Sequence, residues 1–386
     1  MLKIGLIGVG KRGSCLASLL KNSERAQIVY GVDADPDSAR HFMKEHDLRF
    51  DVRNSVLEMA QDPQIDGIIV ATPDHFHAEH ASLAMRGGKA VFCEKPMAIN
   101  IPDCDQMLRV RNETKAALTI GFNLRHQIMY KTMKEISLSG ELGEITSVWV
   151  RHFVGKGGNF YFQDWHSLRS KSNSLLLQKA THDIDLIHYI SGQYTRRLTA
   201  LGKRSYYGGD HPNDLSCPTC EKRSECPDAT DFPVRNQCAF RSEIDVEDNE
   251  MVMMELEKGA IANYSQCHFT PDYHRSFTFI GTKGRMESFE PMYGRTGLEK
   301  NHWEKEHRLE VLFRNSKPSK TYHFASLSGD NHGGADPVMM NDWLSSIQKK
   351  DQNLESAIAG RQSVAVGCLA AESLRGNNEW KTLPAL

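Results

Sequence analysis

Residues 3–13, KIGLIGVGKRG, decide the fold of the first part of the chain. The apolar first half of this stretch predicts a strand, and the run 14–20 behind it predicts a helix. Between them Gly8, Gly10 and Gly13 have the G-x-G-x-x-G spacing, which permits a tight turn, close approach of a pyrophosphate and close helix–strand packing. The stretch therefore predicts a dinucleotide site at the helix N-terminus, where N–H groups and the helix dipole favour an anion.

An acidic residue after the next predicted strand indicates which dinucleotide binds. The run 26–32 predicts that strand, and Asp33 follows it twenty residues after Gly13. A carboxylate at this place suits the two ribose hydroxyls of NAD and repels the 2′-phosphate of NADP. Lys11 and Arg12, inside the glycine turn, are further candidates for cofactor binding. The alternative is a glycine-rich turn that binds no nucleotide.

Length and composition narrow the class of protein. A chain of 386 residues exceeds the usual size of one hydrophobic core, which predicts two domains. Hydrophobic residues make up 40% and charged residues 25%, as in ordinary globular proteins. The formal net charge of −2 provides no basic field, so nucleic acid is not an expected partner. No run is long enough for a membrane span, and no secretory signal precedes the first strand; we expect a cytoplasmic protein with reduced cysteines.

The pattern of predicted strands and helices changes near residue 123. Up to that point predicted strands and helices alternate, which indicates an α/β domain, 1–123, with a doubly wound parallel sheet of the Rossmann type that binds NAD. Strand-like segments then dominate, which indicates an α+β domain, 124–386, with a mostly antiparallel open sheet for substrate binding and oligomerisation. This domain is expected to carry a cysteine-rich insertion at 208–240 and C-terminal helices at 336–375.

A lysine follows the strand predicted at 89–93. Glu94, Lys95 and Pro96 stand at the carboxyl end of this strand, which is the edge of a parallel sheet where ligands bind. Lys95 is therefore expected near the nicotinamide as an acid/base, with Glu94 beside the cofactor and a cis bond before Pro96 that aims the lysine. Asn123, after the last strand of the domain, is expected to reach the cofactor as well. The alternative for Lys95 is a solvated surface group.

These motifs together resemble the Gfo/Idh/MocA oxidoreductase family. The resemblance rests on GVGKRG at 8–13, ATPDHFH at 71–77, EKP at 94–96 and a histidine-containing helix in the second domain. It implies a Rossmann domain, a C-terminal α/β domain whose sheet often forms oligomer interfaces, tightly held NAD(P), and sugar-like or polyol substrates. It also implies a homo-oligomer, a dimer or a tetramer. By the resemblance, Lys95 is the catalytic lysine, and the cofactor-binding segment contains Thr72, Pro73 and His77.

The chain departs from the family in its second domain. The family commonly has D-x-G-x-H, whereas this chain has Gln178 in place of the aspartate and His182 in place of the histidine. A carboxamide cannot accept a proton, but Lys179 introduces a cation. On a helix, Lys179 and His182 are three residues apart and share a face, which predicts an acid/base pocket opposite Lys95. The alternative is a surface ion pair between Lys179 and Asp183.

An aromatic stretch precedes this helix. Residues 157–169 interleave aromatic rings with Asn, His and Arg, which suits the apolar faces and hydroxyls of a sugar. The candidates for substrate binding are Tyr161, Trp165, His166, Arg169 and, from the following helix, Asp183. The alternative is a loop that packs its aromatic rings into the core.

Four of the nine cysteines lie in the insertion, as Cys217, Cys220, Cys226 and Cys238. The insertion has little apolar content and cannot build its own core, so a cross-link is expected. In a reducing compartment four thiolates favour a structural zinc ion in tetrahedral geometry. Free thiols, disulfides and another metal or cluster remain open alternatives.

The sequence thus predicts an NAD-dependent oxidoreductase that transfers a hydride between nicotinamide and a hydroxyl-bearing carbon of a sugar, a polyol or a sugar derivative. The alternative is an NAD-dependent glycoside hydrolase that works by oxidation, elimination, hydration and reduction with recycled NAD. A third possibility is a nucleotide-sensing protein without turnover, which the presence of both Lys95 and His182 disfavours.

Overall fold

The structure is a computed structural model that describes residues 1–155, 157–232, 235–290, 293–294, 306–314, 318–325, 331–349 and 354–386. By its internal contacts the chain divides into two compact units. Unit 1 comprises Met1–His126, Asp330–Val364 and the terminal Leu386, and unit 2 comprises Gln127–Gly329 and Ala365–Ala385. Each unit is described by itself below.

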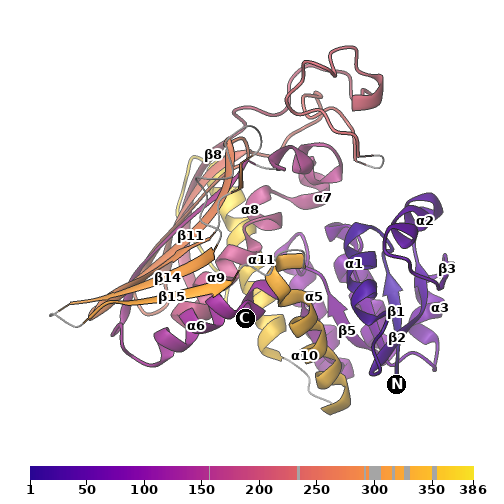
Figure 1. Ribbon diagram of the computed structural model, residues 1–386, viewed down its shortest axis with the longest axis horizontal. Coiled ribbons are helices and arrows are strands. Elements are labelled where there is room, and N and C mark those ends of the chain that lie inside the picture. The colour runs from indigo at the N-terminus through magenta and orange to yellow at the C-terminus, as the bar shows by residue number, and fades with distance from the viewer. Residues whose placement is uncertain are drawn as a thin grey trace. The chain divides into compact units, whose positions relative to one another are not determined.

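Unit 1 is a parallel sheet with helices (Figure 1). Within the described residues the sheet has six strands in the order β3-β2-β1-β4-β5-β6, and each recorded pair is parallel. The strand order reverses between β1 and β4, which is the place where doubly wound sheets bind ligands. This confirms the predicted Rossmann fold. The strands are β1 (Leu2–Ile7), β2 (Ala26–Val32), β3 (Asp51–Arg53), β4 (Gly67–Val70), β5 (Ala90–Cys93) and β6 (Leu118–Ile120). The helices among them are α1 (Lys11–Leu20), α2 (Pro36–Glu45), α3 (Val56–Gln61), α4 (His77–Arg86) and α5 (Ile101–Thr114).

Local sequence signals account for where these helices begin. Gly10 precedes α1, and α2 begins at Pro36, where the fixed φ of proline suits the first helical turn. The Asp35 side chain accepts the N–H groups of Asp37 and Ser38 and so caps α2. Because β4 is buried along its whole length, it carries an unbroken apolar sequence, as expected for a central parallel strand.

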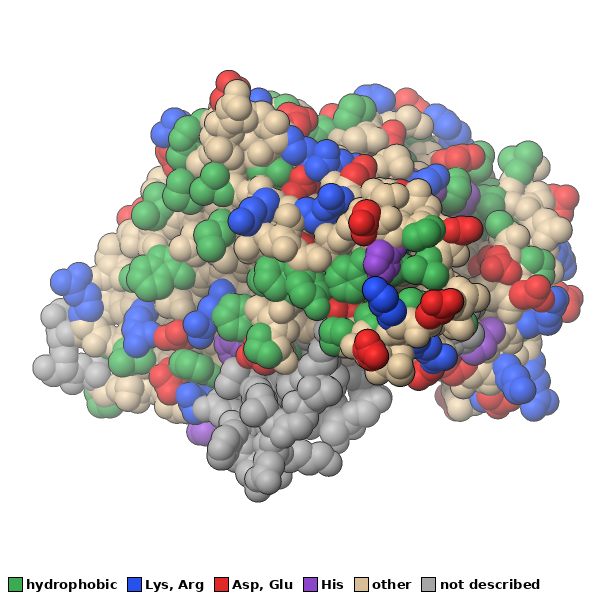
Figure 2. Space-filling view, turned by 90° about the horizontal axis from the view of Figure 1, so that it is seen from above, with side chains coloured by type: hydrophobic (Ala, Val, Ile, Leu, Met, Phe, Trp, Pro, Cys, Tyr) green, Lys and Arg blue, Asp and Glu red, His purple; other side chains and the backbone are tan. Residues whose placement is uncertain are grey.

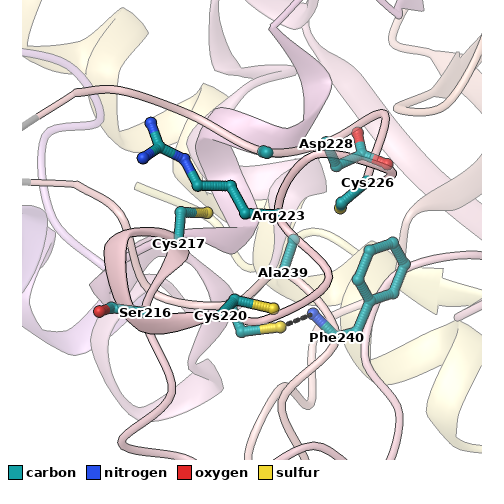
Figure 3. Close-up of a pocket in the computed structure, with 10 residues that line it drawn as sticks. Ser216, Cys217, Cys220, Arg223, Cys226, Asp228, Ala239 and Phe240 are labelled. Atoms are coloured by element: carbon teal, nitrogen blue, oxygen red, sulfur yellow. Dashed lines mark hydrogen bonds between the residues drawn. The ribbon is translucent and has the colours of Figure 1, made fainter.

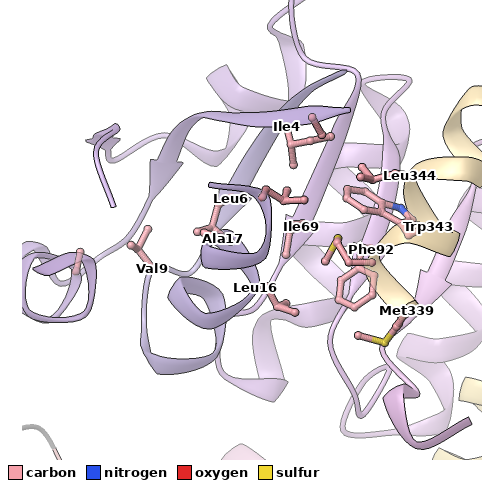
Figure 4. Packing of buried hydrophobic residues seen from close by; sticks show 14 residues of the cluster. Ile4, Leu6, Val9, Leu16, Ala17, Ile69, Phe92, Met339, Trp343 and Leu344 are labelled. Carbon is pink, nitrogen blue, oxygen red and sulfur yellow. The ribbon is translucent and has the colours of Figure 1, made fainter. Parts of the chain in front are cut away.

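A C-terminal helix completes the core of unit 1. α10 (Ala335–Lys349) contributes Met339, Trp343 and Leu344 to a buried cluster with residues of β1, α1 and β4 (Figure 4). The sequence predicts this helix in the second domain with the rest of the C-terminal segment. The structure instead places Asp330–Val364 in unit 1, because the apolar face of α10 packs against this sheet. Nothing in the local pattern of the helix indicates which of two sheets it covers.

Unit 2 is built on an open sheet. Within the described residues it has ten strands, with the path β15-β14-β12-β11-β7-β10-β9-β8-β16 and β13 paired to β11. The β10–β7 pair is parallel and the other recorded pairs are antiparallel, which confirms the predicted mostly antiparallel sheet. The strands are β7 (Ile145–Val154), β8 (Thr195–Lys203), β9 (Asn249–Leu256), β10 (Ile261–Cys267), β11 (Asp272–Gly281), β12 (Gly284–Phe289), β13 (Tyr293–Gly294), β14 (Glu306–Phe313), β15 (Lys320–Ala325) and β16 (Lys381–Thr382).

Helices accompany one side of this sheet (Figure 1). They are α6 (Ile128–Leu138), α7 (Arg169–Ser172), α8 (Leu175–Gln178), α9 (Thr181–Ser191) and the part of α11 (Leu354–Arg375) that follows Val364. In the described part of the chain no helix is long and apolar enough to cross a membrane. On the face that Figure 2 shows, basic side chains are interspersed with acidic ones.

Candidate active site

The glycine turn of unit 1 has the geometry of a nucleotide cradle. Gly8 has a φ of +90°, and a Cβ atom there would stand 2.6 Å from the carbonyl oxygen of Ala71. A Cβ atom on Gly13 would stand 1.9 Å from the carbonyl oxygen of Gly8, so α1 packs directly on the turn. A Cβ atom on Gly10 would meet nothing within 4 Å. The backbone at Gly10 is therefore open to a bound group, and this open turn fits a dinucleotide pyrophosphate.

Asp33 is held against this turn. Its Oδ2 accepts the backbone N–H of Val9 at 2.6 Å, and its Oδ1 accepts that of Asp35 at 2.8 Å. Both bonds fix the carboxylate at the carboxyl end of β2, and the side chain remains partly exposed. This is the position in which an acid accepts hydrogen bonds from ribose hydroxyls.

Arg12, a candidate for cofactor binding, pairs with two carboxylates. Its guanidinium donates to both carboxyl oxygens of Asp336, at 2.6 and 3.0 Å, and its Nε donates to Oε1 of Glu94 at 2.7 Å. Burial alone would lower the pKa of Arg12, but the Glu94 and Asp336 carboxylates raise it. Arg12 is thus engaged with two acids of unit 1, and it ties the glycine turn to the turn after β5. Lys11 is exposed at the start of α1.

The turn after β5 is fixed from several sides. The Lys95–Pro96 peptide is cis, as predicted. The Lys95 N–H donates to Oε2 of Glu94 at 3.2 Å, and the Glu94 side chain is only 8% exposed. A Cβ atom on Gly121 would stand 3.1 Å from the Glu94 carboxylate, so glycine there leaves room for the acid. Lys95 itself remains partly exposed at the carboxyl end of the sheet.

His77 links the two segments that the family resemblance singled out. Its Nδ1 lies 2.7 Å from the carbonyl oxygen of Pro96, and its Nε2 lies 2.9 Å from that of Thr72. The ring is buried, and this burial lowers the pKa of His77. His77 thus braces the segment of Thr72 and Pro73 against the turn of Lys95, while Thr72 and Pro73 are themselves partly exposed.

Asn123 lies buried after β6. Its Nδ2 donates to Oδ1 of Asp336 at 2.9 Å, and its Oδ1 has no hydrogen-bond partner among the described residues. Asp336 therefore joins Arg12 and Asn123, and His332 reaches it as well, with Nδ1 at 3.0 Å from Oδ2. The unpartnered Asn123 oxygen adds an acceptor to the groups of unit 1 that fit a cofactor.

Unit 2 holds a second group of polar side chains around Asp183. This residue is completely buried, and its Oδ2 accepts from Nδ1 of His152 at 2.8 Å and from the Tyr264 hydroxyl at 2.9 Å. Nε of Arg275 lies 3.1 Å from Oδ1. Burial alone would raise the pKa of Asp183, but Arg275 and His152 outweigh it and lower the pKa to about 2. Asp183 is therefore ionised, and it holds three partners from three neighbouring strands.

Lys179 does not form the surface ion pair with Asp183 that the sequence left open. Asp183 is occupied by Arg275 instead, and Nζ of Lys179 lies 5.4 Å from the ring centre of Tyr161 and 5.9 Å from that of Tyr273. Burial is the largest influence on the pKa of Lys179, and it lowers it. A lysine with a lowered pKa between two aromatic rings is suited to exchange a proton.

The predicted helix through Lys179 and His182 is interrupted. α8 ends at Gln178 and α9 begins at Thr181. The N–H of Ala180 bonds to the carbonyl of Leu175, five residues back, which breaks the regular pattern between the two helices. The separation of three residues therefore does not describe one continuous helix face. His182 is 8% exposed in the first turn of α9.

Most of the aromatic candidates lie together. The ring of Trp165 stacks on His166 at 3.7 Å, and the ring of Tyr161 meets His166 edge-on at 5.6 Å. His166 is buried and bonds to Asp164. Arg169 belongs to another group, because its Nη2 donates to Glu247 at 2.8 Å, within a cavity lined also by Lys203, Arg204 and Arg375.

Several residues around Asp183 and Lys179 lie on or just after strands, and the sequence did not predict them. They are His152 on β7, Tyr264 on β10, Arg275 on β11, Tyr273 on β11, and His268 just after β10. His268 is completely buried, and neither of its ring nitrogens has a hydrogen-bond partner in the described part of the chain. Burial, together with Lys179 and His152, lowers the pKa of His268 well below its usual range. The available signal was polar residues at inward positions of alternating strands.

The four cysteines of the insertion line one cavity. Burial raises the pKa of the Cys238 thiol, and the neighbouring sulfurs of Cys217, Cys220 and Cys226 raise it further. Among the described residues, however, no three or more His, Cys, Asp or Glu side chains are arranged to hold a metal ion. The structure thus brings the predicted residues together without a preformed coordination sphere.

Two family models match the chain. The model described as "Oxidoreductase family, NAD-binding Rossmann fold" matches residues 2–122, and the "GFO/IDH/MocA C-terminal domain" matches residues 130–287. The chain is 26% identical over 356 residues to YteT of Bacillus subtilis (strain 168), described as an oxidoreductase, across 80% of this chain and 79% of that protein.

Two further comparisons concern proteins with named substrates. The chain is 27% identical over 201 residues to the myo-inositol 2-dehydrogenase of Thermotoga maritima, across 52% of this chain and 58% of that protein. The structure of a levoglucosan dehydrogenase in complex with NADH and levoglucosan superposes with a TM-score of 0.76 at 20% identity, covering 100% of both chains. The second comparison shows a shared fold.

Proposed function

The chain belongs to the Gfo/Idh/MocA oxidoreductase family, and on that premise we propose that it is an NAD-dependent dehydrogenase acting on a CH–OH group of a sugar, a polyol or a sugar derivative. The observation that carries the proposal is Lys179, whose Nζ lies near the rings of both Tyr161 and Tyr273 and beside the buried Asp183 group. Aromatic faces and a proton-exchanging amine are what a polyhydroxylated substrate requires. One relative of the chain, the myo-inositol 2-dehydrogenase of Thermotoga maritima, is named for such a compound.

The cofactor is NAD in this proposal. The open backbone at Gly10 receives the pyrophosphate, and Asp33 accepts hydrogen bonds from the ribose hydroxyls and repels a 2′-phosphate. Thr72, Pro73 and Asn123 lie at the carboxyl ends of β4 and β6, where the rest of the cofactor is expected. Arg12, Glu94 and His77 support this site by holding the turns in place. When bound, NAD accepts the hydride that leaves the carbinol carbon.

Proton transfer is assigned to the protein. As the carbon–hydrogen bond breaks, the hydroxyl proton passes to a base, and Lys95 is the first candidate because it follows β5 on a fixed turn. Lys179 and His182 are the candidates in unit 2, where Gln178 leaves no carboxylate for this task. The Asp183 carboxylate neutralises Arg275 and orients His152, so it is assigned to positioning.

The test is a panel of free sugars, polyols and sugar acids with excess NAD, monitored by NADH absorbance. The proposal expects NADH formation with at least one compound, and loss of that activity in Lys95→Ala and Lys179→Met. NADH binding without turnover across the panel would instead favour a nucleotide-sensing role. The glycosidase alternative has no specific support in the comparisons, and aglycone release without net NADH would distinguish it.

We also propose that the protein is a homo-oligomer that pairs through the outer face of the unit 2 sheet. Trp149 of β7 and Met253 of β9 both pair with Asn263 of β10, and Met251 of β9 pairs with Leu201 of β8. The four apolar side chains thus share one face, and each is between 54% and 58% exposed. Exposed apolar side chains from three strands on one face, with Asn263 of β10 between two of them, are typical of an interface, here with a second copy of the chain.

A further inference from the structure

The insertion between β8 and β9 has little regular structure. Its described residues contain one short 3-10 helix, Cys217–Thr219, and two isolated bridges, His211 with Arg241 and Ser216 with Gln237. The base of the insertion is anchored, because Tyr207 and Ala239 belong to a buried cluster of unit 2. Beyond that base, turns account for most of the recorded backbone bonds, so another interaction is needed to hold this part of the chain.

The backbone brings the first and last cysteines together. The N–H of Cys217 bonds to the carbonyl of Asn236 at 2.7 Å, and the N–H of Cys238 bonds to that of Leu215 at 2.9 Å. These two bonds run in opposite directions on either side of the Ser216–Gln237 bridge. The cysteines that are 21 residues apart in sequence are therefore neighbours for a structural reason that does not depend on their sulfur atoms.

The turns between them deliver the other two cysteines. The N–H of Cys220 bonds to the carbonyl of Cys217, and the N–H of Cys226 bonds to those of Lys222 and Arg223. All four thiols are free, and all four residues line one cavity of about 20 Å³. Figure 3 shows the sulfur atoms of Cys217, Cys220 and Cys226 directed toward the space that they enclose. A space of this size admits one small ion or water molecule.

The sulfur of Cys238 also has two nitrogen atoms near it. The N–H of Phe240 donates to Sγ at 3.4 Å, and Nδ1 of His211 lies 3.3 Å from the same atom. A backbone N–H such as that of Phe240 stabilises the negative charge of a thiolate and orients a metal-bound ligand. Neither partner is required if Cys238 only fills space in a hydrophobic core.

We propose that Cys217, Cys220, Cys226 and Cys238 bind one zinc ion that fixes the insertion. Four thiolates match the tetrahedral, sulfur-rich coordination of structural zinc, and they leave no open position for catalysis. The sulfurs must draw closer than the structure places them, since no preformed site exists in the described part of the chain. Four thiols and one Zn²⁺ then give a tetrathiolate of charge −2 and release four protons.

The test measures metal content, and it does not depend on the proposed dehydrogenase activity. The protein is purified under reducing conditions with added zinc, dialysed, and analysed by elemental mass spectrometry. The variants are Cys220→Ser and Cys226→Ser, whose side chains are partly exposed, and the matched control is Cys267→Ser at the end of β10. About one zinc per chain is expected in the wild type and the control, and roughly a tenth or less in the two variants.

A second measurement applies if the two variants fail to fold. The wild-type protein is stripped with a chelator under reducing conditions and titrated with Co²⁺, which reports tetrahedral thiolate coordination in its visible spectrum. One equivalent with such a spectrum, displaced by Zn²⁺, supports the site. The proposal is overturned by a wild-type protein without zinc that gives no such spectrum, by intact-mass detection of disulfides among the four residues in the reduced protein, or by bound iron in place of zinc.

Discussion

Nδ1 of His152 and Oδ2 of Asp183 are 2.8 Å apart in a part of unit 2 where both side chains are completely buried. Nε2 of the same ring faces Nη2 of Arg275 at 3.4 Å. The His152 ring therefore donates to an acid on one side and accepts from a cation on the other, which is the bonding of a neutral imidazole. Burial, reinforced by Arg275, lowers the pKa of His152 to about 3.

This relationship predicts that the protein loses stability in weak acid. The unfolded chain takes up a proton on His152 below its usual pKa of 6.5, whereas the folded protein does not until about 3. Stability therefore falls as the pH decreases through this window, by roughly 1.4 kcal/mol per pH unit for this group. Asp183, whose pKa is lowered from 3.8 to about 2, adds a loss in the same direction at lower pH.

Urea unfolding between pH 7.5 and pH 4.5 measures this effect. The slope of the free energy of unfolding against pH is expected to be smaller in His152→Gln, because glutamine at position 152 does not titrate. It is expected to be unchanged in His41→Gln, whose side chain is 41% exposed on α2. Equal slopes in His152→Gln and the wild type would show that His152 is not held neutral. Arg275, Lys179, Tyr273 and His268 are the other groups that interact with His152. Only His268 has its usual pKa in this window, and it is present in both the wild type and His152→Gln, so the difference between their slopes reports on His152.

Asp33 predicts the choice of cofactor. Asp33→Asn keeps an oxygen for the N–H of Val9 but removes the negative charge, so the preference for NADH over NADPH is expected to fall by about tenfold, or about 1.4 kcal/mol. Asp33→Arg is expected to shift the preference further, because attraction replaces repulsion of the 2′-phosphate. Fluorescence titration with both reduced cofactors gives the ratio of dissociation constants. A ratio that stays the same in both variants would refute this reading of Asp33.

Loss of the Lys95 side chain is expected to affect turnover of the substrate but not binding of NADH. Lys95→Ala is expected to lower kcat by about 10²- to 10⁴-fold, since a positioned acid/base is lost. NADH affinity is expected to change little, because the cradle at Gly10 and the carboxylate of Asp33 are untouched. The control is Lys115→Ala, an exposed lysine at the end of α5. An active Lys95→Ala enzyme would remove Lys95 from the mechanism.

The outer face of the unit 2 sheet predicts how the protein assembles. Trp149→Glu and Met253→Lys place charges in the apolar surface and are expected to shift the wild-type oligomer to monomers in sedimentation velocity. Leu57→Lys changes a side chain that is 52% exposed on α3, and it is expected to leave the mass unchanged. A monomeric wild type, or an oligomer that both sheet variants retain, would contradict the proposed interface.

The features that follow from short stretches of sequence were predictable. The glycine turn, Asp33 and the cis bond before Pro96 each depend on residues within one strand and the turn after it. The doubly wound parallel sheet of unit 1 follows as well, because alternating strands and helices permit few topologies. Asp33 and Lys95 follow β2 and β5 directly, so they lie at the carboxyl ends of the strands, as the strand pattern predicts.

The features that depend on distant pairs were not predictable. Arg12 is engaged by Asp336, 324 residues away, and no local pattern indicates that pairing. The Asp183 group takes His152, Tyr264 and Arg275 from three strands whose register sequence patterning does not determine. The break between α8 and α9 coincides with a five-residue backbone bond from Ala180 to Leu175, which helix propensity does not reveal.

The proposed NAD-dependent dehydrogenase activity is tested most directly by measuring two products in one cuvette. Purified protein with NAD is given a panel of aryl glycosides and free sugars, and NADH absorbance and aglycone release are followed together. We expect NADH to accumulate in proportion to the oxidised substrate, without release of the aglycone. Aglycone release with only catalytic NAD and no net NADH would contradict it, and would identify a redox-neutral glycosidase.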